Sequence, residues 1–311
     1  MKIRPFRESD YDDVFRLYRE QSAALSFHHN VRRDQFKKDL FTTRFIRNPA
    51  DHHMKARVAF VALKKNRICA FASGGLVIKG DEVVEAGTGY IQAIIAEPSS
   101  AAAVKEVLPR VIAHIRGYEP KKIVAQDACM CPVFFADSAG SLPSRWAWIG
   151  QCLLDVGFEV SSRSLRLVAR FDGPLRKVVA PRGLKFFRLT HEMHSFDPRY
   201  DFGCVLLKPP YQYGDGVVWC GNFYSGVFVK GTAYRSLYMN YFTIMDEAYR
   251  GKGLGRLVLQ YCLYEAQQRG AHHASLLTDI DNLVAQNLYQ SEGFEVVDAM
   301  HSFELNVKQK V

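Results

Sequence analysis

Residues 246–256 read Asp-Glu-Ala-Tyr-Arg-Gly-Lys-Gly-Leu-Gly-Arg, a glycine-rich stretch between two apolar patterns. The run before it, 236–245, is rich in apolar and aromatic side chains and is typical of a strand. After it, apolar side chains recur at helical spacing, which predicts a helix over 254–269 that ends at Gly270. Another strand is expected at 274–278. Strand, glycine loop, helix and strand in this order indicate an α/β or α+β fold.

The glycine-rich stretch has the chemistry of an anion site. Glycines let the backbone approach a ligand closely and turn N–H groups toward it, and the N-terminus of the following helix adds roughly half a positive charge. Arg250, Lys252 and Arg256 add formal positive charge. The stretch lacks the Ser/Thr of a Walker loop and the spacing of the dinucleotide fingerprint. It therefore predicts a phosphate ligand, most simply a pyrophosphate; the alternative is an ordinary glycine-rich turn.

A second element follows about thirty residues later. Asp281 or Asn282 can cap a helix that Gly293 ends. Asn282 and Tyr289 are seven residues apart, so they are expected on one helix face, two turns apart. An amide and a phenol on one face suit a polar ligand lying along the helix. The alternative for Tyr289 is a half-buried aromatic side chain of the core.

Together, the two elements resemble the GNAT superfamily of N-acetyltransferases. Arg250-x-x-Gly253-x-Gly255 is similar to that superfamily's cofactor loop. The later stretch Asn282-x-x-Ala285-x-x-Leu288-Tyr289-x-x-x-Gly293-Phe294 is similar to its later cofactor-binding helix. The resemblance extends over about residues 182–307.

The resemblance implies acetyl-CoA as co-substrate, with the loop N–H groups on its pyrophosphate and the preceding strand along its pantetheine arm. The cofactor-binding residues that it implies are Thr243, Ile244, Met245, Arg250, Gly251, Lys252, Gly253, Leu254, Gly255, Arg256 and Asn282. Tyr289 is the implied catalytic residue beside the sulfur, where it can protonate the leaving thiolate. No metal is implied.

The first half of the chain repeats the order of elements. Gly157-Phe-Glu-Val160 recurs as Gly293-Phe-Glu-Val296, and each string precedes an alternating strand pattern. A shared order of strands and helices favours an internal duplication. Within this half, Pro109 is expected to kink or shorten a helix over 104–115.

The chemistry is lost in the first half. Glu97–Ala103 replaces the glycine loop, and Trp146 and Leu153 stand where the second half has Asn282 and Tyr289. The sequence thus predicts two tandem GNAT-like domains, each a mixed, mostly antiparallel twisted sheet flanked by helices. The expected division is 1–172 for the degenerate domain, 173–182 for a linker, and 183–311 for the acetyl-CoA-binding domain.

Composition excludes several other classes. The 311 residues include 41 Lys and Arg against 32 Asp and Glu, which gives a net charge of +9, and 48% are hydrophobic. This composition excludes a disordered chain or a coiled coil. The longest stretch without a charged residue, 216–229, is too short to span a membrane, and the N-terminus has no signal-peptide core, so a cytoplasmic protein is expected. Dispersed basic residues argue against nucleic acid, and the scattered Cys and His residues against a metal site or a disulfide framework.

The expected activity is direct transfer of an acetyl group from acetyl-CoA to an amine. A backbone N–H near Ile244 or Met245 can polarise the thioester carbonyl. The base is either a water or a carboxylate near the strand ends, for which the candidates are Asp246, Glu247, Asp279 and Asp281; each of these is equally a solvated turn residue or a cap. The acceptor, a small-molecule or peptide amine, and the oligomeric state are not readable from the sequence. A non-catalytic protein that holds acetyl-CoA or CoA as a regulatory ligand is the alternative.

Overall fold

The computed structural model describes residues 1–23, 25, 32–41, 52–79, 82–83, 87–125, 141–189, 203–207, 236–239, 250–268 and 270–307. Its helices are α1 (Tyr11–Ser22), α2 (Arg33–Phe41), α3 (Ala101–Arg116), α4 (Ala147–Asp155), α5 (Leu254–Gln268) and α6 (Leu283–Ser291), with 3₁₀ turns at Glu8–Asp10, Pro98–Ser100 and Ser144–Trp146. Its strands are β1 (Lys2–Pro5), β2 (His52–Lys64), β3 (Arg67–Lys79), β4 (Glu82–Val83), β5 (Thr88–Ala96), β6 (Lys122–Ala125), β7 (Leu142–Pro143), β8 (Glu159–Arg170), β9 (Lys185–Leu189), β10 (Gly203–Leu207), β11 (Ser236–Met239), β12 (His273–Asp279) and β13 (Glu295–Asn306).

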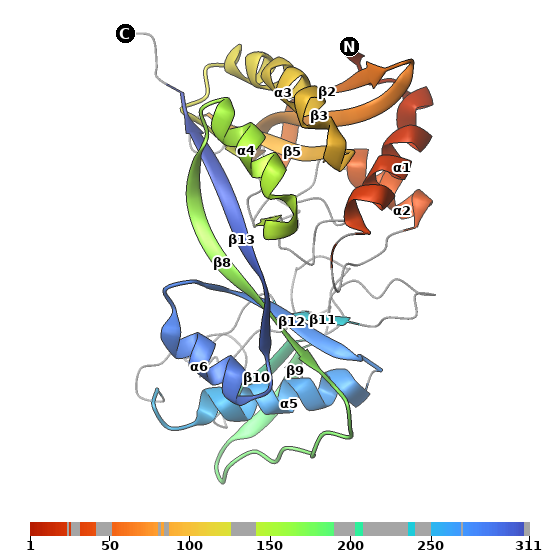
Figure 1. The fold of residues 1–311 in the computed structure, drawn as a ribbon. Coiled ribbons are helices and arrows are strands. Elements are labelled where there is room, and N and C mark those ends of the chain that lie inside the picture. The colour runs from red at the N-terminus through yellow and green to blue at the C-terminus, as the bar shows by residue number, and fades with distance from the viewer. Residues whose placement is uncertain are drawn as a thin grey trace. The chain divides into compact units, whose positions relative to one another are not determined.

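The chain forms two compact units, unit 1 (Met1–Ser164 with Ala299–Val311) and unit 2 (Leu165–Asp298). Two strands belong to both units. β8 begins in unit 1 and continues into unit 2 after Ser164, and β13 returns from unit 2 to unit 1 after Asp298. β8 and β13 are neighbours in the strand order (Figure 1). The last strand of each half therefore divides its residues between the units.

These units are defined by packing, whereas the sequence-based division into 1–172, 173–182 and 183–311 describes repeats along the chain and stays a prediction. The mixed α/β fold with a mostly antiparallel sheet flanked by helices is confirmed. Within the part of the chain that the structure describes, no helix is both long and apolar enough to cross a membrane.

The sheet of unit 1 has the order β1-β2-β3-β5-β6-β13, with β4 on β3 and β7 on β13. β5 and β6 pair in parallel, and the other registered pairs of this sheet are antiparallel. The turn between β2 and β3 has positive φ at Lys65 and Asn66, as a two-residue type I′ turn requires. α3 packs on β2, β3 and β5, while α1 contacts β3 and β5, so one core joins these elements.

Pro109 does not shorten α3, which runs as one helix from Ala101 to Arg116. The expectation of a shorter helix was wrong because Pro109 lies on the exposed face. The carbonyl that it deprives of a partner belongs to Lys105, which is exposed on the same side and accessible to water.

In unit 2, β11 pairs in parallel with β12, from Ser236↔His273 to Met239↔Leu276, and β8 is the other neighbour of β12. β9 and β10 form a separate antiparallel pair. α5 and β12 confirm the helix and the strand expected after the glycine loop, and β11 confirms the start of the strand expected before it. The apolar faces of α5 and β12 share a core with β8, β10 and α6. Its buried members are Leu167, Ala169, Leu206, Leu254, Val258, Leu259, Cys262, Leu263, Ala266, Ala271, Ala274, Leu276, Tyr289 and Phe294.

Candidate functional site

The glycine loop has the backbone conformation that its sequence predicts. Gly251 and Gly253 have φ of +72° and +74°, a region that side chains rarely adopt, and a Cβ at either position would meet no atom within 4 Å. The backbone here is therefore open to a ligand. Leu257 N–H donates to Gly253 C=O at 3.1 Å, so α5 starts directly at the loop. An open, glycine-lined turn at the N-terminus of a 15-residue helix fits a phosphate group.

Three exposed cations lie at the loop. Arg250 and Lys252 are exposed beside the glycines. Arg256, in the first turn of α5, contacts the end of α6: its Nε lies 2.9 Å from Glu292 Oε1, and it donates to Ser291 Oγ at 3.0 Å. The positive charge of Arg256 is thus already paired within the protein.

α6 begins as its sequence predicts. Asn282 is its N-cap, and the side-chain oxygen of Asn282 accepts from the N–H of Ala285 at 3.2 Å. Gln286 donates to the carbonyls of Asp279 and Ile280 at 3.1 and 2.7 Å, which fixes the turn between β12 and α6. Asn282 is exposed and beside the C-terminal end of β12.

Tyr289 lies in the core of unit 2, with only 6% of its surface exposed. Its ring packs against Phe294 with the ring centres 5.8 Å apart. Burial raises the pKa of the Tyr289 hydroxyl to about 12, so the group is a protonated donor at neutral pH. Tyr289 is thus an aromatic residue of the core, as the alternative interpretation held. Its catalytic role stays a prediction.

Three predicted cofactor-binding residues, Thr243, Ile244 and Met245, lie outside the described residues. Two of the candidate carboxylates, Asp246 and Glu247, lie there as well. The described structure therefore brings together the loop of residues 250–256, the cap of α6 and Tyr289. Among the described residues, no three His, Cys, Asp or Glu side chains are grouped so that they could hold a metal ion.

Comparison with known proteins supports this grouping of loop and helix. Residues 202–294 match the model of the acetyltransferase (GNAT) family, a segment that contains the glycine loop, α5 and α6 up to Phe294. This segment of the chain is therefore similar to the GNAT family. No curated protein matches the sequence.

The fold of the chain is similar to those of several solved N-acetyltransferase structures, one of them a tandem GNAT protein. A tandem GNAT protein from the clavulanic acid biosynthesis pathway aligns with a TM-score of 0.68 at 11% identity, covering 100% of this chain and 99% of that one. A GCN5-related N-acetyltransferase from Sphaerobacter thermophilus gives 0.66 at 11% identity, with 100% and 96% covered. A glucosamine N-acetyltransferase region of a fungal multi-domain β-N-acetylglucosaminidase gives 0.62 at 12% identity, with 98% of this chain and 38% of that one covered. At these identities the likeness concerns the fold.

The helix that precedes the repeated Gly-Phe-Glu-Val string has the same construction in both units. α4 and α6 have nine residues each, with Trp146 and Asn282 as their N-caps. Both end in a glycine at positive φ, Gly157 or Gly293, and the N–H of the following Phe donates to a carbonyl five residues back, both at 3.1 Å. That carbonyl belongs to Leu153 in α4 and to Tyr289 in α6. The correspondence of Leu153 with Tyr289, predicted by counting residues, is therefore confirmed by geometry.

In unit 1, the strand edge before α3 is occupied by the protein itself. β5 pairs with β6 only up to Ile91↔Ala125 among the described residues, yet it continues to Ala96. Beyond that point, Gln21 of α1 accepts from the N–H of Ala96 at 3.0 Å and donates to the carbonyl of Ile94 at 3.4 Å. Trp146 Nε1 donates in turn to the carbonyl of Gln21 at 3.2 Å. A buried side-chain amide thus satisfies the groups that an extended, amide-containing ligand would otherwise pair with.

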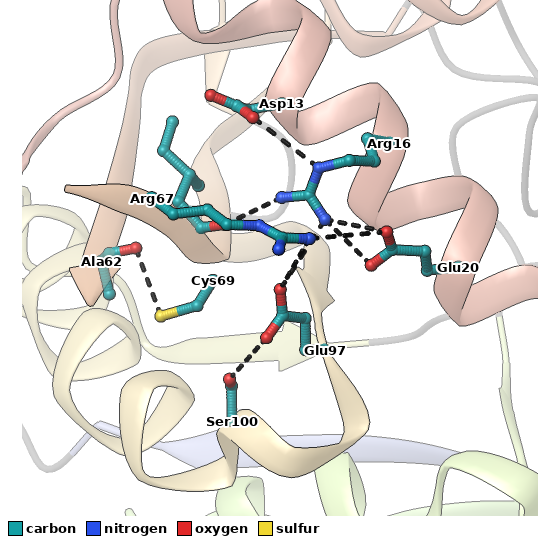
Figure 2. A network of polar contacts seen from close by, with 9 residues as sticks. Asp13, Arg16, Glu20, Ala62, Arg67, Cys69, Glu97 and Ser100 are labelled. Carbon is teal, nitrogen blue, oxygen red and sulfur yellow. Dashed lines mark hydrogen bonds and ion pairs between the residues drawn. The ribbon is translucent and has the colours of Figure 1, made fainter. Parts of the chain in front are cut away.

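Before the loop of unit 1, a carboxylate follows β5 and pairs with two arginines. Figure 2 shows Arg16 and Arg67 directed toward two carboxylates, Glu20 and Glu97. Glu97, the residue that follows β5, lies 3.7 Å from Arg16 and 3.6 Å from Arg67, and Ser100 donates to it at 3.5 Å. Both guanidinium groups at the end of β5 therefore have carboxylate partners.

Sequence reasoning missed two contributors, Gln21 in unit 1 and Glu292 in unit 2. Gln21 is 75 residues from Ala96, so no local pattern connects them. Glu292 follows α6 directly and pairs with a residue of α5, and only the packing of the two helices could reveal that pairing.

Proposed function

We propose that unit 2 is an N-acetyltransferase that moves an acetyl group from acetyl-CoA to an amine by direct attack. The observation that carries the proposal is the open glycine turn at the N-terminus of α5, inside the segment that matches the GNAT family. The loop N–H groups of residues 251–256, with Arg250 and Lys252, would hold the pyrophosphate, and Asn282 would lie beside the pantetheine arm. Acetyl-CoA supplies the activated thioester.

Tyr289 is the proposed proton donor. When the amine nitrogen bonds to the carbonyl carbon and the carbon–sulfur bond breaks, the thiolate takes the Tyr289 proton, and the surplus amine proton passes through a base or water and restores the proton of Tyr289. Burial raises the pKa of the Tyr289 hydroxyl to about 12, so the hydroxyl is protonated at neutral pH and can donate a hydrogen bond to the sulfur as the carbon–sulfur bond breaks. Backbone N–H groups of the strand at residues 243–245 are the proposed partners of the thioester oxygen.

The proposed acceptor is a small-molecule or peptide amine. Exposed carboxylates at the end of β12, Asp279 and Asp281, are candidate bases, and water-mediated deprotonation is the alternative. A panel of amines, assayed by release of free CoA thiol, separates these acceptor classes.

We propose that each chain binds one acetyl-CoA. Gln21 occupies the strand edge of unit 1, Trp146 replaces Asn282, and Glu97 stands where the loop should be positive. Calorimetric titration should therefore give one site per chain. Two sites per chain would contradict the assignment of unit 1.

The test of the cofactor site is substitution in the loop. In Gly251→Val and Gly253→Val, the side chain occupies the space predicted for the ligand and disfavours the positive φ, so acetyl-CoA affinity should fall by at least about tenfold. Gly183→Val is the matched control, since Gly183 also has positive φ (+82°) and open space but lies outside the site. Unchanged affinity in folded loop variants would refute the assignment. Binding without transfer to any amine would favour the non-catalytic, regulatory alternative.

A further inference from the structure

The end of α6 is fastened to the first two turns of α5 by one carboxylate. Glu292 receives Arg256 Nε at 2.9 Å on one oxygen and Gln260 Nε2 at 2.9 Å on the other. Arg256 and Gln260 are four residues apart, so they lie on one face of α5. Only 13% of the Glu292 side chain is exposed, against 54% for Arg256. Both carboxylate oxygens are therefore used, and the contact is well shielded on the Glu292 side.

This contact reaches the backbone of Tyr289. The N–H groups of Glu292 and Phe294 both donate to the Tyr289 carbonyl, at 3.0 and 3.1 Å. Ser291, which receives Arg256, donates to the Leu288 carbonyl at 2.7 Å. The last turn of α6, which carries Tyr289, is thus hydrogen-bonded to Ser291 and Glu292. These two residues are in turn bonded to α5, and α5 begins at the glycine loop.

We propose that Glu292 and Arg256 are positioning residues that keep Tyr289 in register with the glycine loop, and that Arg256 is not a phosphate ligand. The inference rests on the proposed function, because it supposes that the loop and Tyr289 act on one molecule of acetyl-CoA. A pyrophosphate would have to compete with Glu292 and Ser291 for Arg256. Reacting groups that are misplaced by about 1 Å lose on the order of 10²-fold in rate. A contact between Glu292 and Arg256 that fixes the position of Tyr289 can therefore affect the transfer rate.

The test is a double-mutant cycle with Arg256→Met and Glu292→Gln, in which kcat for acetyl transfer and Kd for acetyl-CoA are measured separately. Each single variant should lower kcat by about tenfold, and the double variant should be no worse than the worse single, because both break one contact. The Kd should change by less than about twofold in all three. Lys252→Gln, which removes an exposed cation beside the loop, should instead raise the Kd.

Asp155→Asn is the matched control for stability. Asp155 makes the corresponding ion pair between two helices of unit 1: it is at the end of α4, and its carboxylate lies 2.6 Å from Lys105 Nζ of α3. No chemistry is assigned to this position. It should leave kcat unchanged. An Arg256→Met variant whose Kd rises tenfold while Glu292→Gln binds normally would overturn the proposal and make Arg256 a phosphate ligand. Unchanged kcat in both single variants, or an equal loss in Asp155→Asn, would also overturn it.

A readout without acetyl transfer distinguishes failure of this inference from failure of the proposed function. Alkaline absorbance titration of Tyr289, taken as the difference between each variant and the same variant with Tyr289→Phe, reports how well the hydroxyl stays buried. Loosening of α6 in Glu292→Gln should move its pKa from about 12 toward the ordinary value of about 10. An unchanged pKa of Tyr289 in Glu292→Gln would contradict the positioning role of Glu292, even if the wild-type protein proved inactive. Inactivity of the wild type toward all amines, with the titration moved, would contradict only the proposed function.

Discussion

Replacing Tyr289 by phenylalanine removes one hydroxyl from the core of unit 2 and keeps the ring. The substitution therefore distinguishes a role of the ring in packing from a role of the hydroxyl in acetyl transfer. The ring stays in place against Phe294, so the melting temperature near neutral pH should change little. If the hydroxyl protonates the thiolate, the transfer rate should fall by about 10²–10⁴-fold under conditions where chemistry is limiting. Acetyl-CoA affinity should stay within about threefold, because the hydroxyl acts on the leaving group rather than on binding.

The same substitution has an alkaline signature. The pKa of Tyr289 is about 12 in the folded protein against about 10 when unfolded, so the folded state holds the proton more tightly. The stability that follows is fully present below about pH 10 and is lost as pH rises to about 12. Two pKa units correspond to about 3 kcal/mol. Tyr289→Phe should remove that part of the fall in unfolding free energy, measured by urea denaturation at pH 8 to 11.

Tyr90→Phe is the control, since Tyr90 is also deeply buried, at 1% exposure, but in unit 1. It should leave the transfer rate unchanged. A Tyr289→Phe protein that turns over at the wild-type rate would remove Tyr289 from the mechanism. An unchanged alkaline slope would show that the hydroxyl is not shielded as described.

Three further outcomes are expected. Replacing both Arg250 and Lys252 by glutamine should weaken acetyl-CoA binding about tenfold and flatten its dependence on salt, as measured by calorimetry at two ionic strengths; an unchanged salt dependence would contradict their role. Gln21→Ala should destabilise the protein by about 2 kcal/mol, since two buried backbone groups lose their partner, while acetyl-CoA affinity in unit 2 is unchanged; a gain of a second binding site would show that the amide alone closes unit 1. A fragment of residues 173–311 lacks the strand Leu165–Arg170 and should show no cooperative thermal unfolding; a cooperative transition with intact acetyl-CoA binding would contradict the shared-strand fold.

Local sequence signals predicted the elements of the site well. The glycine loop, the cap at Asn282 and the helix end at Gly293 each depend on residues within one or two turns, and all three have the expected geometry. Such features follow from backbone preferences that act over a few residues. The match between Leu153 and Tyr289 was also readable because both helices have the same length and the same end.

Contacts between distant parts of the chain were not predictable in this way. Gln21 bonds to β5 across 75 residues, and nothing about a glutamine in an amphipathic helix marks it for that role. Arg256 was read as a loop cation because it lies near the glycines in sequence, yet its side chain follows the α5 surface to Glu292. A helical side chain is directed by packing, which single-sequence patterns do not encode.

Two strands, β8 and β13, contribute residues to both units. Residues Leu165–Arg170 of β8 follow unit 1 in the chain but contribute Leu167 and Ala169 to the core that contains Tyr289. Conversely, the end of β13 follows unit 2 in the sequence but pairs with β6 of unit 1, from Phe303↔Ala125 to Asn306↔Lys122. Each unit therefore uses residues from the other half of the chain. Unit 2 buries Leu167 and Ala169 of β8, and in unit 1 β6 pairs with the end of β13. The residues of unit 1 that differ from the loop and the helix of unit 2, Glu97–Ala103, Trp146 and Leu153, lie outside these strand pairs, so the differences leave the pairing of the shared strands intact.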